Sequence, residues 1–312
     1  MTTSETVAIR QPRHSSRPMA GQRSFANGPL VWLLPSILTL LAVSLYPQLY
    51  SLVNSFRFFN LGVSPEPLNF VGLDNFARAF RDDGFLGAVG RTTLFAVVAT
   101  TFEIVLGIFI ALVLNQKLRG VNVARTLLIM PTAIAPAVAG LVFRHLYSTE
   151  GGLVPFLLEA MGVDVPAEGI LGSPRTALLG VLATDVWQWT PFVALIVLAG
   201  LQGVPSELVE AAQVDGASPV RAFWSVILPM LKTVIVTVTL LRFIQTFNVF
   251  DIVYVETRGG PGVSTNVIGL DIYYNGLSYY DIGYASALTW IVAIFIAAII
   301  NVYLATAGRR NR

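Results

Sequence analysis

Four ionisable residues lie inside long apolar runs of this 312-residue chain: Glu103, Asp185, Arg242 and Asp251. In a bilayer an ionisable group costs at least about 2–3 kcal/mol, so it normally faces a cavity or an opposite charge. The fixed positive charge of Arg242 has to be compensated, because an unpaired buried charge is very costly. Two interpretations stay open. Arg242 pairs with Asp185 or Glu103 and presents the pair to ligand hydroxyls, or it holds an anionic group such as a phosphate bidentately.

Uncharged polar residues and aromatic rings accompany these charges at helical spacing. Asp185 and Gln188 are three residues apart and share a helix face, and Arg242 shares a face with Gln245 and Thr246. Hydrogen-bonding groups mixed with rings suit a sugar as ligand. The candidate ligand contacts are Asp185, Gln188, Trp189, Phe192, Arg242, Gln245, Thr246 and Asn248. The alternative is that polar groups join helices and rings pack or face lipid. We expect Glu103 to serve packing and Asp251 to be structural.

The sequence has few residues of the types that bind nucleotides, act as nucleophiles or ligate metals. The two lysines, Lys117 and Lys232, do not fit a phosphate-binding G-x-x-x-x-G-K-[ST] loop. The absence of cysteine removes thiolate catalysis and cysteine metal sites. His14 and His145 lack H-E-x-x-H spacing, and no G-x-S-x-G is present. We therefore expect no enzyme activity, no cofactor and no metal site, and the net charge of +2 does not indicate a nucleic-acid partner.

The elements that position these residues are predicted to be membrane-spanning helices. Only 12% of the residues are charged, against about 25% in a typical soluble domain. About 20 apolar residues are needed to cross the hydrocarbon layer as a helix. Six runs qualify: 30–53, 92–114, 126–146, 176–199, 234–255 and 284–305. The first is too long for the 7–15-residue core of a secretory signal, so we interpret it as an uncleaved span. The predicted fold is all-α and polytopic.

The distribution of Lys and Arg orients the spans, because cytoplasmic loops carry an excess of them. With the N-terminus inside, the majority of the twenty Lys and Arg residues fall in cytoplasmic segments. We therefore expect both termini in the cytoplasm. The corresponding division is a cytoplasmic tail at 1–28, a membrane domain at 29–306 and a second cytoplasmic tail at 307–312.

The loop between the fourth and fifth predicted spans has the signals of a short helical hairpin. Ser206 is a candidate N-cap, with Glu207 and Glu210 near the positive end of the first helix. Gly216 is a natural stop, because glycine tolerates the left-handed conformation. Ala211 makes this helix slim, so that a groove on another protein can approach its backbone. The simpler alternative is an amphipathic connection at the membrane surface.

The second helix of the hairpin is predicted to begin at Ser218-Pro219, with proline at its first position. Ala222, Phe223 and Val226 form its apolar face. We expect Pro229 to break it before the fifth span.

This hairpin resembles the EAA loop of binding-protein-dependent ABC importer permeases. The matching residues are Glu210-Ala211-Ala212, Gly216, Val226 in place of the usual Ile, and Leu228-Pro229. Asp215-Gly216-Ala217 matches the carbohydrate branch of that family. Further matches span roughly residues 30–306, and include Trp187, Pro191-Phe192, Leu201-Gln202, Phe250-Asp251, Tyr254, Gly259-Gly260-Pro261, Thr265, Phe70, Gly72 and Asn75-Phe76.

The resemblance implies a transport subunit of a bacterial cytoplasmic membrane that moves a sugar or sugar derivative. In such permeases the EAA helix docks into a cleft of a separate cytosolic ATPase. That role is transferred to Glu210, Ala211, Ala212, Asp215 and Gly216. The implied partners are a distinct second permease forming a heterodimer, two ATPase subunits, an extracytoplasmic solute-binding protein and membrane lipid. An ungapped count also puts Arg242 and Thr246 at positions that resemble sugar contacts of maltose-type permeases, whereas apolar Val249 departs from the pattern.

Two rival functions remain. A secondary transporter needs coupling carboxylates within the membrane, for which Glu103 or Asp185 are available, but the EAA loop argues against it. A membrane scaffold without transport activity is disfavoured by the intramembrane charges.

Overall fold

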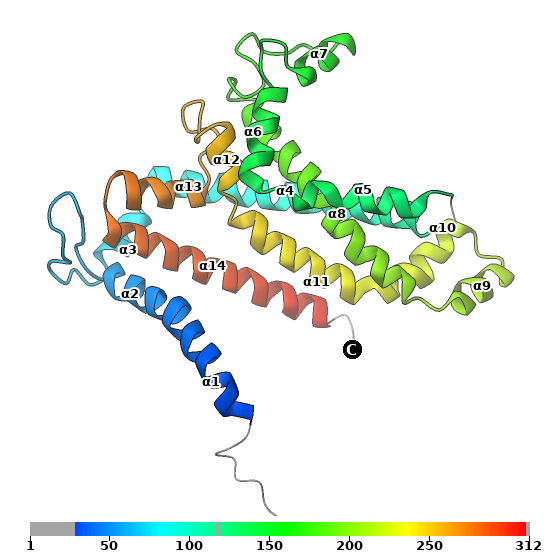
Figure 1. The fold of residues 1–312 in the computed structure, drawn as a ribbon, viewed down its shortest axis with the longest axis horizontal. Helices are drawn as coiled ribbons and strands as arrows, with labels where there is room; N and C mark the ends of the chain where they lie inside the picture. The colour runs from blue at the N-terminus through cyan, green and yellow to red at the C-terminus, as the bar shows by residue number, and fades with distance from the viewer. Residues whose placement is uncertain (1–28, 117–118, 310–312) are drawn as a thin grey trace, which may run out of the picture. The chain divides into compact units, whose positions relative to one another are not determined.

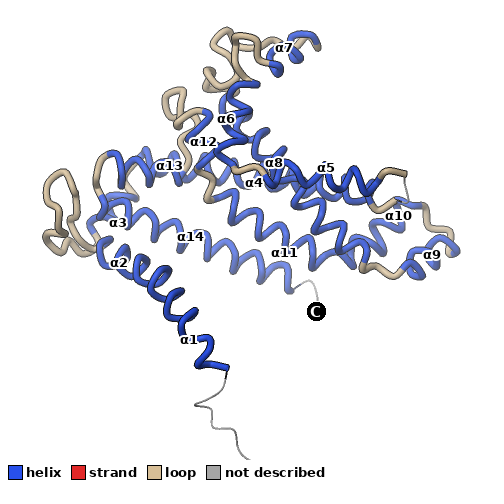
Figure 2. The backbone as a smooth tube through the Cα atoms, in the orientation of Figure 1, coloured by secondary structure: helices blue, strands red, loops and turns tan. Residues whose placement is uncertain are grey.

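The computed structural model describes residues 29–116 and 119–309, and this part is helical, with no strand beyond two isolated β-bridges (Figures 1 and 2). The chain separates into two compact units, Met1–Tyr50 and Ser51–Arg312, which are considered one at a time. The predicted tail at 1–28 and residues 310–312 of the second tail lie outside the described residues. The C-terminal helix extends to Arg309, three residues beyond the predicted end of the membrane domain.

One long apolar helix begins in the first unit and ends at Ser55, within the residue range of the second. Helix α1 (Pro29–Leu40) continues through a π-helical turn (Leu41–Leu45) into α2 (Tyr46–Ser55). In the turn the N–H of Tyr46 donates to the carbonyl of Leu41, so the chain passes Pro47 without a break. Trp32–Ser55 is long and apolar enough to cross a membrane, which agrees with the predicted first span.

The second unit contains the remaining helices. In chain order they are α3 (Asp74–Ala79), α4 (Asp83–Leu114), α5 (Val121–Ala133), α6 (Pro136–Leu146), α7 (Leu153–Ala160), α8 (Ala177–Gln202), α9 (Ser206–Val214), α10 (Pro219–Ala222), α11 (Leu228–Phe247), α12 (Asp251–Glu256), α13 (Ile268–Tyr273) and α14 (Ile282–Arg309). There are two more π-helical turns in the described part. Phe223–Ile227 joins α10 to α11, and Tyr274–Ser278 follows α13.

Helices α4, α8 and α11 form the packed centre of this unit. The contact between α4 and α8 is the most extensive of any helix pair in the described part, and α11 packs against both. Gly107 makes the close approach possible, because a Cβ there would lie 2.6 Å from Cγ1 of Val193 on α8. Side chains at this level of α4 and α8 are therefore brought within reach of α11.

The third predicted span is not one continuous helix. Helices α5 and α6 are bent by 96° at Ile134 and Ala135, whose backbones are extended. Pro136 causes the break, because a proline disfavours helical backbone in the residue before it. The described residues thus hold five helices that can cross a membrane, or six if the bent pair is one span. After the bend α6 lies beside α12 (Figure 1).

The helical hairpin forms as predicted, except in two details. Two features agree with the prediction: Gly216 has φ +85°, and the hydroxyl of Ser218 accepts a hydrogen bond from the N–H of Arg221. The N-cap of α9 is Pro205 rather than Ser206, which is already helical and makes no capping hydrogen bond.

The second correction concerns Pro229, which does not break the second helix. The π-helical turn before it, closed by the bond from Leu228 N–H to the carbonyl of Phe223, leads directly into α11. The widened turn accommodates the proline without losing helical continuity.

Candidate functional site

A buried charge cluster joins the three central helices and consists of Glu103 on α4, Asp185 on α8 and Arg242 on α11. Nε of Arg242 donates to Oε2 of Glu103 at 2.6 Å, and Nη2 donates to Oε1 of Glu103 at 2.7 Å. Nη2 also donates to Oδ2 of Asp185 at 3.1 Å. The side chain of Arg242 is only 1% exposed. The predicted pairing of Arg242 is confirmed, and it involves both carboxylates.

Neighbouring side chains complete the surroundings of the guanidinium. Nη1 of Arg242 donates to Oε1 of Gln245 at 2.9 Å, one helical turn further along α11. The ring of Trp189 lies 4.7 Å from Cζ of Arg242, a cation–π distance. Glu103, which we expected to serve packing, is buried and binds Arg242 through both its oxygens, so it belongs to the ion pair that joins the helices.

The cluster borders a cavity of about 290 Å³, called the central cavity below. Its lining residues are Pro136, Asp185, Trp189, Arg242, Gln245, Asn248, Val249, Phe250, Asp251 and Ile252. Residues 248–250 are the break between α11 and α12, and Pro136 follows the break between α5 and α6. Irregular backbone at membrane depth is tolerated where it lines a cavity. Both helix breaks therefore surround the same space.

Five of the eight predicted ligand contacts line the central cavity: Asp185, Trp189, Arg242, Gln245 and Asn248. The other three do not. Nε2 of Gln188 donates to the carbonyl of Ile134 at 2.7 Å, and so supports the bend between α5 and α6. Phe192 stacks edge-on against Trp189, with ring centroids 6.1 Å apart. Thr246 is buried, and its hydroxyl has no partner among the described residues.

Sequence reasoning did not count Asp251 among the ligand contacts, and it named Glu103 only as one possible partner of Arg242. Asp251, predicted to be structural, is exposed and lines the cavity. Glu103 lies behind Arg242 and holds it in place. Gly107, one turn further on, allows α4 to approach α8 closely near Glu103.

The helical hairpin presents a second candidate surface. Glu210, Ala211, Asp215 and Gly216 are exposed, and Ala212 is half-buried. A hollow of about 580 Å³ beside α9 is lined by Asn115, Leu201, Val204, Ser206, Val209, Glu210, Gln213 and Ile227. Large apolar side chains nearby are also exposed, with Val214 at 88% and Trp224 at 64%.

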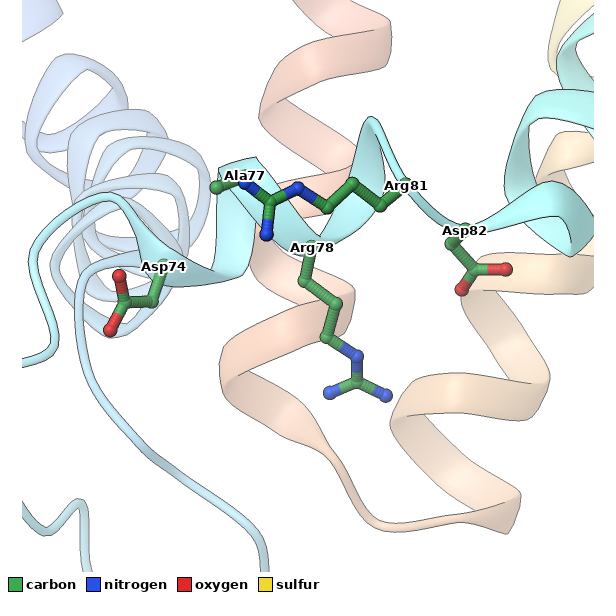
Figure 3. Close-up of a pocket in the computed structure, with 5 residues that line it drawn as sticks. All are labelled: Asp74, Ala77, Arg78, Arg81 and Asp82. Atoms are coloured by element: carbon green, nitrogen blue, oxygen red, sulfur yellow. The ribbon is translucent and has the colours of Figure 1, made fainter.

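A third hollow, of about 500 Å³, lies along α3 and is lined by Asp74, Ala77, Arg78, Arg81 and Asp82. Figure 3 shows Arg81 extending back toward Ala77, whereas Arg78 points to another side. The guanidinium of Arg78 binds Asp281 at 2.8 Å and lies over the ring of Tyr284.

Asp82 fixes the start of α4 at the edge of this third hollow. It caps the helix through the N–H groups of Gly84 and Phe85, and it accepts a 2.7 Å bond from the Tyr284 hydroxyl. Burial raises the pKa of Asp82, but these hydrogen bonds and Arg78 outweigh it and leave the pKa below its ordinary value. These contacts fix α3 and α4 to α14, and they present no arrangement of groups for catalysis.

Comparison with known proteins identifies relatives over most of the chain. The family model described as binding-protein-dependent transport system inner membrane component matches residues 103–309. A probable ABC transporter permease protein of Sinorhizobium fredii is 35% identical over 300 residues, covering 96% of this chain and 94% of that one. The trehalose/maltose transport system permease protein MalF of Thermococcus litoralis is 37% identical over 243 residues, covering 78% and 81%.

The fold also has a counterpart among solved structures. A chain from the crystal structure of a bacterial ABC transporter involved in the import of the acidic polysaccharide alginate matches with a TM-score of 0.78 and 22% identity. The match covers 91% of this chain and 96% of that chain. At this identity the likeness establishes the shared fold, and the substrate has to be argued from the site.

Proposed function

The chain belongs to the family of binding-protein-dependent transport system inner membrane components, and from this premise we propose that it forms half of a translocation path for a sugar, opened by ATP hydrolysis on a separate cytosolic subunit. The observation on which the proposal rests is the central cavity, placed between two helix breaks and bordered by a buried charge cluster. A path has to expose a binding site at membrane depth, and broken helices allow this.

The chemistry of the cavity suits a sugar. Gln245, Asn248 and Asp251 supply amide and carboxylate groups for hydroxyls, and Trp189 and Phe250 supply ring faces. Ligand sites combine apolar walls with a few placed polar groups in this way. Relatives whose names state trehalose and maltose transport support the same substrate class.

Coupling to the ATPase is assigned to α9. Its C-terminus ends in a Schellman arrangement, in which the N–H of Ala217 donates to the carbonyl of Ala212 at 2.9 Å. This arrangement requires the left-handed conformation of Gly216 and leaves Glu210 and Ala211 exposed for a partner. Because α9 is joined through α10 to α11, a push on this exposed helix is transmitted to the helix that bears Arg242.

The complete importer then contains this chain, a second and different permease, two ATPase subunits and an extracytoplasmic solute-binding protein. We place both termini of this chain in the cytoplasm and the assembly in a bacterial cytoplasmic membrane. The chemistry of ATP hydrolysis belongs to the ATPase subunits, since no phosphate-binding loop occurs in this sequence.

The proposal is tested by purifying the chain from its own host and reconstituting the complex with the solute-binding protein. An ATPase subunit should co-purify in stoichiometric amount, and labelled neutral sugars should enter proteoliposomes only with ATP. Uptake that follows an ion gradient without ATP would instead identify a secondary transporter, in which Glu103 and Asp185 serve ion coupling.

A further inference from the structure

We propose that the central cavity admits neutral sugars and rejects sugars that bear a phosphate, carboxylate or sulfonate group. The inference rests on the proposed function and adds the substrate class. It follows from how completely Arg242 is occupied and from the balance of charge around the cavity.

Among the described residues, Arg242 is the only cationic one that lines the central cavity, and it is already engaged. A guanidinium has five N–H groups. The contacts of Arg242 with described partners number four: two to Glu103, one to Asp185 and one to Gln245. The edge formed by Nε and Nη2, which suits an anion best, is held by the carboxylate of Glu103. An anionic substrate would have to displace that carboxylate and leave it buried without a partner.

The net charge of the groups around the cavity also disfavours binding of an anionic substrate. One guanidinium faces three carboxylates: Glu103 behind it, Asp185 beside it and Asp251 on the cavity wall. If one of the buried carboxylates holds a proton, the net charge of these groups is still negative; if both do, Asp251 offsets Arg242 and no net positive charge remains to bind an anion. At an effective dielectric constant of about 20, one uncompensated carboxylate about 6 Å from an anionic group weakens binding about 100-fold.

A neutral sugar meets suitable partners in the same cavity. Carboxylates accept hydrogen bonds from hydroxyls, and a charged acceptor makes the stronger kind of bond. Gln245 lines the cavity and accepts from Arg242 through Oε1, so its Nε2 remains available as a donor. Asn248 donates to the carbonyl of Ile244, so its Oδ1 remains an acceptor. Trp189 adds an aromatic face.

The test compares sugars that differ only in one phosphate: trehalose with trehalose 6-phosphate, maltose with maltose 1-phosphate and glucose with glucose 6-phosphate. Binding is measured on the purified permease–ATPase complex without the solute-binding protein, so that delivery does not set the outcome. The signal is the change in tryptophan fluorescence on adding sugar, after subtraction of the change that the Trp189→Phe variant still shows. In each pair whose neutral sugar binds, the neutral sugar should bind about 100-fold more tightly than its phosphate.

Two charge-removing variants show where the selectivity resides. Asp251→Asn should reduce the ratio of neutral to phosphorylated affinity about tenfold or more, because it removes a negative charge from the cavity wall. Asp164→Asn, which removes the same charge at an exposed position outside the cavity lining, should leave the ratio unchanged. Because Asp251 is exposed and outside the buried cluster, its variant should fold normally.

Each outcome decides the inference. Equal binding of a neutral sugar and its phosphate overturns it and leaves the proposed function intact. A large ratio that Asp251→Asn does not change also overturns it, because the selectivity then resides elsewhere. If no sugar gives a Trp189-dependent signal and none is taken up with ATP, the proposed function itself fails, and this inference fails with it.

Discussion

At the scale of single residues, the charge cluster shows what a sequence reveals about buried charges. The apolar context of Arg242 indicates that it needs a partner, and the candidates Glu103 and Asp185 are evident from the sequence alone. The choice between them depends on how three helices are rotated, which periodicity does not specify. In the structure Arg242 binds both carboxylates. Gln188 was predicted to contact the ligand, but its side chain donates a hydrogen bond to the backbone carbonyl of Ile134 and does not line the cavity.

Removing Arg242 is expected to be strongly destabilising. Arg242→Ala leaves two carboxylates buried without their counter-ion, and loss of one member of a buried ion pair costs about 3–5 kcal/mol. Replacing all three charges together, as Glu103→Gln, Asp185→Asn and Arg242→Gln, should cost less, because no unpaired charge remains. The matched control is Arg221→Ala on the exposed face of α10, with an effect within about 0.5 kcal/mol.

The measurement for these variants is the free energy of unfolding of the purified complex in mild detergent. If Arg242→Ala proves no less stable than Arg221→Ala, the cluster does not hold the three helices together.

At the scale of elements, hydropathy locates the spans but not their interruptions. Residues 126–146 are apolar for most of their length, yet the chain bends by 96° where Ile134 and Ala135 become extended. A proline within an apolar run permits either a break or a continuous helix. Pro136 breaks its helix, whereas a π-helical turn passes Pro229. Which of these occurs depends on tertiary partners such as Gln188, and these are invisible in a linear pattern.

The bend predicts a specific role for Gln188. Gln188→Leu removes the donor to the Ile134 carbonyl and should lower the free energy of unfolding by about 1 kcal/mol. The cost is moderate, because Oε1 of Gln188 has no partner among the described residues and its removal is favourable. Gln202→Leu, an exposed change at the end of the same helix, is the control and should be nearly neutral. A loss of equal size in both variants would contradict the supporting role.

Gly216, at the end of α9, has a closely matched control in Gly162, which follows α7. Gly216 and Gly162 have φ +85° and +76°, and neither has a neighbouring atom that a Cβ would meet. Substitution by alanine strains both backbones alike, by about 1–2 kcal/mol. We predict that only Gly216→Ala abolishes most of the stimulation of ATP hydrolysis by the solute-binding protein, because only Gly216 ends the helix that we propose contacts the ATPase. Equal stimulation in the two variants would show that the geometry of this turn does not matter for coupling.

At the scale of the whole molecule, the chain is a permease subunit of the ABC importer family. The fold class, most of the spans and the helical hairpin could be predicted from the sequence, because each depends on local apolar length or capping chemistry. Five of the ten residues that line the central cavity could also be predicted, because polar and aromatic residues recur at helical spacing inside apolar runs. The cavity itself could not, because it arises where two helix breaks that are about a hundred residues apart in the chain meet.

The central claim is that the central cavity opens to opposite sides of the membrane in turn as ATP is bound and hydrolysed. The chain contains no cysteine, so Asn248→Cys places one thiol of this subunit on the exposed wall of the cavity. The decisive measurement is the rate at which a membrane-impermeant thiol reagent, added from one side of proteoliposomes, modifies this introduced thiol. We predict a change of at least about tenfold between the nucleotide-free and vanadate-trapped complexes, in opposite directions for the two sides, with protection by the transported sugar. Equal rates in both states, without protection by sugar, would contradict the claim.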